Sequence, residues 1–140
     1  MSKQVNIDIT VPNQTKYLGM IGRIGESLAY SLKSYHGNRR ELAYHINLVL
    51  TEALANAIRH ANDFDPDKEV RVTISVSDQK LTIKVFDQGQ GFDIETLAKL
   101  KARESDEGGR GIQLIFKLMD QVRYIQEGDS NVLEMTKHLH

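Results

Sequence analysis

The chain has 140 residues, of which 40% are hydrophobic and 26% are charged, so its size and composition are those of one ordinary globular domain spanning residues 1–140. Its formal net charge of -1 at pH 7 and the lack of a basic run exclude a bulk electrostatic attraction to nucleic acid or to an anionic membrane. The absence of cysteine excludes disulfides, thiolate catalysis and cysteine-ligated zinc.

Apolar residues are nowhere gathered into a long segment. A membrane span needs ~18 consecutive apolar residues, and no run in the sequence approaches that length. The first residues, Met1-Ser2-Lys3-Gln4, are not followed by the apolar stretch of a signal peptide. We therefore expect a cytoplasmic protein without a membrane segment.

The first half of the chain predicts one strand and two helices. Apolar and polar residues alternate over residues 5–11, which is the period of a half-buried strand, and Pro12 ends it. Apolar residues at intervals of three and four predict one helix over residues 18–32 and another over residues 39–61. Three glycines each weaken the first helix by ~1 kcal/mol relative to alanine. They are Gly19, Gly22 and Gly25.

The second half of the chain predicts two hairpins and two helices. The predicted elements are strands over 70–76 and 81–85, helices over 94–101 and 112–120, and strands over 122–126 and 132–139. Helices therefore lie between pairs of hairpin-compatible strands. This order predicts an α+β fold in which helices cover one face of a sheet.

A polar line runs along the second predicted helix. Glu52 and Asn56 lie four residues apart and therefore on one helix face, and His60 lies one turn further along. A carboxylate there could deprotonate a water or a hydroxyl, and an amide oxygen one turn away suits Mg²⁺. The alternative is an ordinary solvated helix face, with His60 packed against the next loop.

A glycine-bearing loop follows the predicted strand over residues 81–85. Asp87 would end that strand and could accept a hydrogen bond from the exocyclic amine of a ligand. Gly89 and Gly91 permit backbone conformations and a close ligand approach that larger side chains forbid. An ordinary glycine-rich loop is the competing interpretation.

A second glycine-rich segment, Gly108-Gly109-Arg110-Gly111-Ile112, opens the predicted helix at Ile112. Backbone amides at a helix start can hold a phosphate, and Arg110 could add a charge-assisted contact. A flexible linker is the alternative. The segment is not a P-loop, because no Gly-Lys-Ser/Thr follows, and it is not a Rossmann fingerprint, whose glycines follow the first strand of a βαβ unit.

The order and spacing of these three segments resemble the GHKL ATPase family, which includes gyrase, a heat-shock chaperone, histidine kinases and a mismatch-repair protein. The shared pattern is a helical Glu-x-x-x-Asn, a strand ending in Asp-x-Gly-x-Gly, and a charged stretch leading into Gly-x-Gly at a helix start. It extends over nearly the whole chain. The short length and the run from Gly109 to Val122 look most like the stand-alone anti-sigma-factor serine kinases. The resemblance implies a two-layer α/β sandwich of the GHKL (Bergerat) type with a mixed, mostly antiparallel sheet.

The resemblance also implies ATP and Mg²⁺ as ligands. Glu52 would be the general base that polarises the acceptor hydroxyl, Asn56 would hold the magnesium ion, and Asp87 would bind the adenine amine. The other implied contacts are Gly89 and Gly91 at the floor of the adenine site, and Gly109, Arg110 and Gly111 at the phosphates. Residues 99–108 would form an ATP lid. Its cations are either ligand contacts or solvated charges, and they are Lys99, Lys101 and Arg103.

The chain departs from the family pattern at two places. Many members have a threonine on a late strand that helps to read adenine, where this chain offers Ser130 or Asn131. Anti-sigma members commonly carry an arginine in the first helix that meets the partner. Here Arg23 is the nearest candidate, while Lys16 and Met20 occupy the equivalent early turn.

The function implied by the resemblance is that of an ATP-dependent protein serine/threonine kinase. It would phosphorylate an anti-anti-sigma (STAS-type) partner and sequester a sigma factor. One alternative is an ATP-binding partner-switching module without kinase activity and with a non-sigma partner, and a weaker one is a relative that activates a larger enzyme. A histidine kinase is disfavoured, because no helix pair with a phospho-accepting histidine precedes the pattern in this sequence. The oligomeric state is open between a monomer and a homodimer.

Overall fold

The structure is a computed structural model, and it describes residues 4–33, 35–89 and 107–139. Its elements are β1 (Val5–Pro12), the short 3-10 helix η1 (Thr15–Tyr17), α1 (Leu18–Tyr30), α2 (Arg39–Asn56), the π-helical turn η2 (Ala57–Ala61), β2 (Glu69–Val76), β3 (Lys80–Asp87), α4 (Glu107–Leu118), β4 (Gln121–Glu127) and β5 (Ser130–His138). The strands predicted over 5–11, 70–76, 81–85, 122–126 and 132–139 are confirmed to within three residues at each end.

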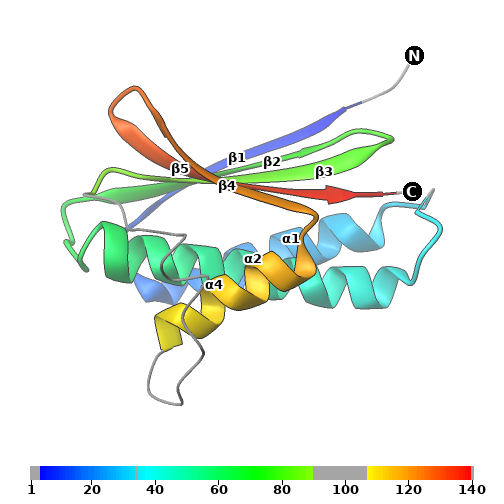
Figure 1. Ribbon diagram of the computed structural model, residues 1–140, viewed down its shortest axis with the longest axis horizontal. Coiled ribbons are helices and arrows are strands. Elements are labelled where there is room, and N and C mark those ends of the chain that lie inside the picture. The colour runs from blue at the N-terminus through cyan, green and yellow to red at the C-terminus, as the bar shows by residue number, and fades with distance from the viewer. Residues whose placement is uncertain (1–3, 34, 90–106, 140) are drawn as a thin grey trace.

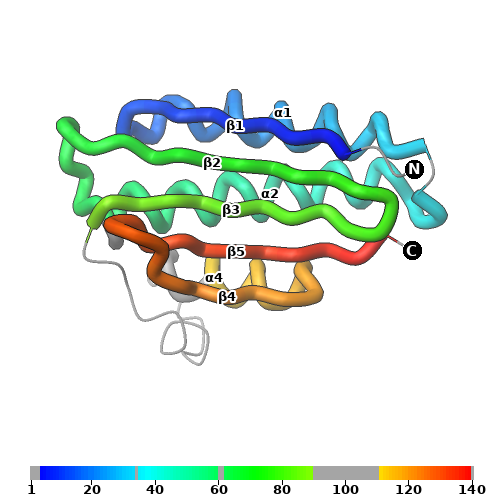
Figure 2. Tube along the Cα trace, turned by 90° about the horizontal axis from the view of Figure 1, so that it is seen from above, coloured from blue at the N-terminus to red at the C-terminus, as the bar shows by residue number. Residues whose placement is uncertain are grey.

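The five strands form one sheet in the order β1-β2-β3-β5-β4, and each of these four pairs is antiparallel (Figure 2). The helices α1, α2 and α4 all lie on the same face of this sheet (Figure 1). The predicted two-layer α+β sandwich with one covered face is therefore confirmed. Among the strands that the structure describes, the sheet is wholly antiparallel rather than mixed.

The core lies between the sheet and the helices, and α2 supplies the largest helical share of it. Alternate residues of β2 and β3 are buried, as the period of two predicts for strands with one covered face. The buried stripe of α2 faces them, and it contains Leu42, Ile46, Val49, Leu50, Ala53 and Leu54. Asn38 caps the start of α2, because its side-chain oxygen accepts a hydrogen bond from the backbone N–H of Glu41 at 3.1 Å.

Two glycines allow α1 to pack closely on α2. A Cβ atom at Gly25 would collide with the side chain of Leu50, and one at Gly22 would lie 2.6 Å from Oδ1 of Asn47. The sequence left open whether the glycine row serves contacts within the chain or between subunits. For Gly22 and Gly25, the contacts are within the chain.

The helices differ from the prediction in two details. The predicted helix over 39–61 is α2 followed by the π-helical turn η2. The helix predicted to begin at Ile112 begins at Glu107 instead, so that prediction of its start was wrong. The helix predicted over 94–101 lies outside the described residues. In the part of the chain that is described, no helix is both long and apolar enough to cross a membrane.

Candidate active site

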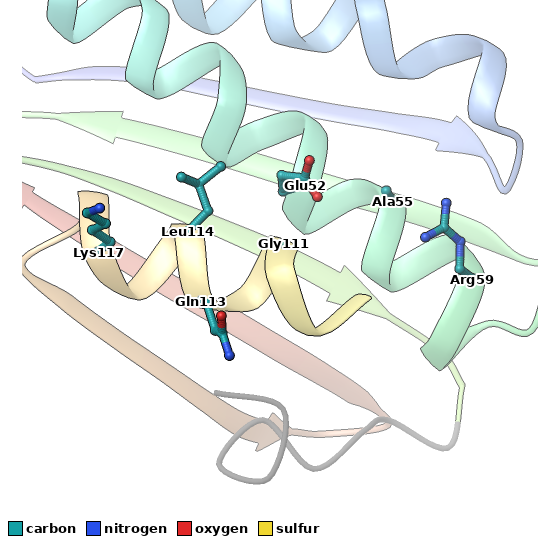
Figure 3. A pocket seen from close by; sticks show the side chains of 7 residues that line it. All are labelled: Glu52, Ala55, Arg59, Gly111, Gln113, Leu114 and Lys117. Atoms are coloured by element: carbon teal, nitrogen blue, oxygen red, sulfur yellow. The ribbon is translucent and has the colours of Figure 1, made fainter. Parts of the chain in front are cut away.

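A cleft of about 570 Å³ is lined by residues of α2 and α4 (Figure 3). Its described lining comes from both helices and from η2, and consists of Glu52, Ala55, Arg59, Gly111, Gln113, Leu114 and Lys117. Figure 3 shows Arg59 and Lys117 at opposite ends of the cleft, with Glu52 between them. The carboxylate predicted as a general base therefore lies at a cleft wall, half-buried, rather than on a fully solvated helix face.

Gly111 brings α4 close to the polar line of α2. A Cβ atom at this position would collide with Oε2 of Glu52 and would lie 3.2 Å from Nδ2 of Asn56. A side chain at this position would force the Glu52 carboxylate to move from where it lies. Three of the predicted site residues, from two segments far apart in the sequence, are thus brought together.

Asn56 has an unusual hydrogen-bonding state for a buried amide. The residue is 2% exposed, and its Nδ2 donates to the backbone carbonyl of Glu52 at 2.8 Å. Its Oδ1 is buried and accepts no hydrogen bond from the described residues. A buried acceptor without a donor costs about 1–3 kcal/mol unless a ligand satisfies it. An amide oxygen is a ligand type that Mg²⁺ accepts, so the residues present fit the predicted metal.

Asp87 ends β3 with its carboxylate almost fully buried, at 1% exposed. Its Oδ1 accepts hydrogen bonds from the backbone N–H of Gly89 at 3.1 Å and from Nδ2 of Asn131 at 3.0 Å. Its Oδ2 accepts one from the hydroxyl of Tyr124 at 2.8 Å. The carboxylate is therefore held in one orientation by groups from β4, β5 and its own turn.

Of the two residues predicted to replace the family threonine, Asn131 is the one that meets Asp87. The two residues are paired across β3 and β5, which explains the contact. Tyr124 was not among the predicted site residues. It lies in β4, 37 positions from Asp87 in sequence, and its strand pattern gave no signal beyond that of a half-buried aromatic residue.

Asn62 links the end of η2 to the end of β3, and sequence analysis also missed it. The side chain is fully buried, its Oδ1 accepts from the backbone N–H of Gln88 at 3.1 Å, and its Nδ2 donates to Oδ1 of Asn13 at 3.1 Å. Asn62 is followed by two non-glycine residues with positive φ, Asp63 and Phe64. This constrained turn joins the helix that carries Glu52 and Asn56 to the sheet that carries Asp87.

Several predicted site residues are placed only in part or lie outside the described residues. Gly91 and the lid cations Lys99, Lys101 and Arg103 lie outside. Gly109 and Arg110 belong to the first turn of α4, not to a loop before it. His60 lies in η2. The roles predicted for these residues stay predictions.

Comparison with known proteins supplies the family. The model of the histidine kinase-like ATPase domain matches residues 21–137, a span that contains Glu52, Asn56, Asp87 and Gly111. The chain belongs to this family. The fold described above is thus that of a histidine kinase-like ATPase domain, and the predicted GHKL-type assignment is confirmed.

This ATPase domain is also similar to curated serine-protein kinases. It is 32% identical to the serine-protein kinase RsbW of Listeria innocua, covering 95% of this chain and 87% of that protein. It is 30% identical to RsbW of Bacillus subtilis, covering 95% and 85%. These similarities place the chain among the protein serine/threonine kinases of the family.

A solved structure supports the fold alone. The histidine kinase domain of a blue-light activated histidine kinase from Erythrobacter litoralis matches with a TM-score of 0.58 at 22% identity. The match covers 92% of this ATPase domain, which spans 62% of that chain.

Proposed function

We propose that this chain transfers the γ-phosphoryl group of ATP to a serine or threonine of an anti-anti-sigma (STAS-type) protein and sequesters a sigma factor. The observation that carries this proposal is the meeting of Glu52, Asn56 and Gly111 at the α2–α4 cleft. The carboxylate of Glu52 lines this cleft, and the buried Oδ1 of Asn56, one helical turn further along α2, accepts no hydrogen bond from the residues that the structure describes. Positioning and charge neutralisation are the main requirements of phosphoryl transfer, and this set can supply both.

Each residue has a distinct proposed role. Glu52 accepts the proton of the acceptor hydroxyl as that oxygen attacks the γ-phosphorus, the bond from this phosphorus to the β,γ-bridging oxygen breaks, and ADP leaves. Asn56 would hold Mg²⁺ through Oδ1. The metal ion, when bound, neutralises phosphate charge. Asp87 binds the adenine amine. The remaining proposed contacts are Gly89 and Gly91 at the base, and Gly109, Arg110 and Gly111 at the phosphates.

The proposed partners approach at surfaces away from the sheet core. Arg23 is exposed on α1, and Met20 one turn earlier is 39% exposed, so both are available to a sigma factor. The relatives' name, serine-protein kinase, supports a protein as the phosphate acceptor. We propose a cytoplasmic location, and a homodimer as the form that meets the sigma factor.

Two steps test the proposal. First, the chain is used to retain proteins from source-cell extract with and without Mg-ATP, and the retained proteins are identified by mass spectrometry. Second, the transfer of labelled γ-phosphate from ATP to the retained protein is measured for the wild type and for Glu52→Gln. We expect at least a ~100-fold slower transfer in this variant, because a positioned general base contributes about that factor or more, while the ATP Kd stays within about threefold.

Glu127→Gln is the matched control, because this glutamate is exposed at the end of β4 and the substitution is the same. We expect this control to transfer phosphate at the wild-type rate. Unchanged transfer in Glu52→Gln would refute the role of Glu52 as base. If partners are retained in an ATP-dependent way but wild-type protein transfers no label, the ATP-gated binding module without kinase activity becomes the better account.

A further inference from the structure

Hydrogen bonds from the residues that the structure describes leave one acceptor position open on the carboxylate of Asp87. A carboxylate offers about four acceptor positions, two on each oxygen. Gly89 N–H and Asn131 Nδ2 fill the two positions on Oδ1, and the Tyr124 hydroxyl fills one position on Oδ2. The remaining position is therefore on Oδ2. Because Asp87 is 1% exposed, bulk water does not freely satisfy it.

A single open acceptor position on a buried carboxylate selects for a ligand with one N–H donor at that point. The 6-amino group of adenine supplies such a donor. A purine with hydrogen at position 6 leaves this acceptor position on Oδ2 without a donor. Guanine places a carbonyl oxygen, which is also an acceptor, against Oδ2. Sites of this kind reject an analogue that lacks the donor, because the buried polar group is left unpaired.

We infer that Tyr124 and Asn131 are positioning residues that set the selectivity for adenine. Their hydrogen bonds occupy acceptor positions on the Asp87 carboxylate and fix its orientation. One acceptor position on Oδ2 then remains to bind the base. This inference rests on the proposed role of Asp87 as the adenine contact. It assigns to β4, through Tyr124, a part in nucleobase recognition that the sequence motifs do not contain, and it gives Asn131 of β5 the role of orienting Asp87.

The two residues act on different parts of the site. Nδ2 of Asn131 donates both to Oδ1 of Asp87 and to the backbone carbonyl of Gly89, each at 3.0 Å. Asn131 therefore ties the end of β3 to the turn that follows it. Tyr124 acts on the other oxygen. Its ring packs against the core, so its hydroxyl is delivered to Oδ2 by a side chain with little freedom of its own.

The experiment measures Kd by calorimetry for ATP, GTP and purine riboside triphosphate, which lacks the 6-amino group, with the wild type and with Tyr124→Phe. The phenylalanine removes only the hydroxyl, so Oδ2 gains a second open position and loses its fixed direction. We expect the preference for ATP over purine riboside triphosphate to fall about tenfold, the worth of a hydrogen bond to a charged group. The Kd of purine riboside triphosphate should change by less than about twofold.

Asn131 is tested by a pair of variants. Asn131→Ala should lower the same preference about tenfold, and Asn131→Thr, whose hydroxyl can still donate to Asp87, should restore part of it. Tyr30→Phe is the control, because Tyr30 is 47% exposed at the end of α1 and should keep the wild-type preference. Thermal unfolding of each variant verifies that it is folded, and the threonine variant keeps the test available if the alanine variant is not.

The outcomes separate this inference from the proposed function. If Asp87→Asn binds ATP as tightly as the wild type, the proposed role of Asp87 is wrong, and the inference is overturned with it. If Asp87→Asn weakens ATP binding but Tyr124→Phe and Asn131→Ala keep the wild-type preference, the inference alone is overturned. A fall in affinity that is equal for all three nucleotides also overturns it, because that is the effect of a general structural role.

Discussion

At the scale of single residues, the candidate site depends on how little space separates α4 from the polar line of α2. Gly111 faces both the carboxylate of Glu52 and the amide of Asn56, and no larger residue fits there without displacing one of them. Site geometry of this kind tolerates displacements of only a fraction of an ångström before catalysis suffers.

Gly111→Ala tests this dependence directly. The added methyl group displaces the Glu52 carboxylate, so we expect phosphoryl transfer to fall about 100-fold. The free energy of unfolding should change by less than about 1 kcal/mol, because the displaced group is the flexible end of a side chain at the cleft wall. Urea unfolding and the rate of label transfer are the two measurements. A variant with the wild-type rate would show that the carboxylate can move aside without loss of function.

The site residues that could be predicted are those joined by local sequence. Glu52 and Asn56 are four residues apart on one helix, so their proximity follows from helix geometry. The contacts of Asp87 with Tyr124 and Asn131 cross strands that are far apart in sequence, and only the register of β3, β4 and β5 brings them together. Asn62 likewise bonds to Asn13 and Gln88, which are distant in sequence, so no local sequence pattern predicts these hydrogen bonds.

At the scale of elements, the fit of α1 against α2 determines how the helical layer is built. The glycines of α1 that lower its intrinsic helix stability are needed where they face α2, because Cβ atoms there would meet Leu50 and Asn47. Gly19 differs from them, since a Cβ atom would meet only the flexible end of Arg23 at 3.3 Å, and the residue is exposed.

Gly25→Ala and Gly19→Ala should therefore have opposite effects on stability. The first should lower the free energy of unfolding by about 1–3 kcal/mol, because it overpacks the α1–α2 contact. The second should raise it by up to about 1 kcal/mol, because alanine favours the helix and meets no rigid neighbour. Urea unfolding of both variants checks the pair, and destabilisation by both would contradict the assignment of Gly19 to an open surface.

The hydrophobic periodicity of the sequence predicts most helices and strands, but it does not predict where each of them begins. The strands and the long second helix could be predicted, because each has a regular alternation or stripe of apolar residues. The start of α4 could not, since Gly108, Gly109 and Gly111 favour a loop by intrinsic propensity. The helix nevertheless begins at Glu107, and at Gly111 the absence of a side chain is what its packing against α2 requires.

At the scale of the whole molecule, the two halves of the site belong to different layers. Glu52 and Asn56 lie on the helical layer, and Asp87 lies at the end of a central strand of the sheet. Asn62 joins these layers through its hydrogen bonds to Gln88 and Asn13. The relative position of the two halves therefore depends on a buried amide that touches neither half of the proposed ATP site directly.

Asn62→Ala should affect both stability and nucleotide binding. It removes the hydrogen bond to the N–H of Gln88 and leaves the buried Oδ1 of Asn13 without its donor, so we expect a loss of about 1–3 kcal/mol in the free energy of unfolding. The Kd for Mg-ATP should rise severalfold, because the turn after Asp87 is less well held. Asn6→Ala, at an exposed position of β1, is the control and should change neither quantity. Wild-type affinity in Asn62→Ala would show that the layers are held together without this residue.

The sheet order also has a consequence for how the chain folds. The first strand pairs with the second from Val5 with Val76 to Pro12 with Glu69, so α1 and α2 lie between the partners. Bringing two strands together across this sequence distance costs chain entropy before their contacts contribute favourable free energy, and this slows folding. During synthesis at roughly 5–20 residues per second, β1 leaves the ribosome several seconds before its partner. The nascent chain can form its helices in that interval, but it cannot begin its sheet from the end that is made first.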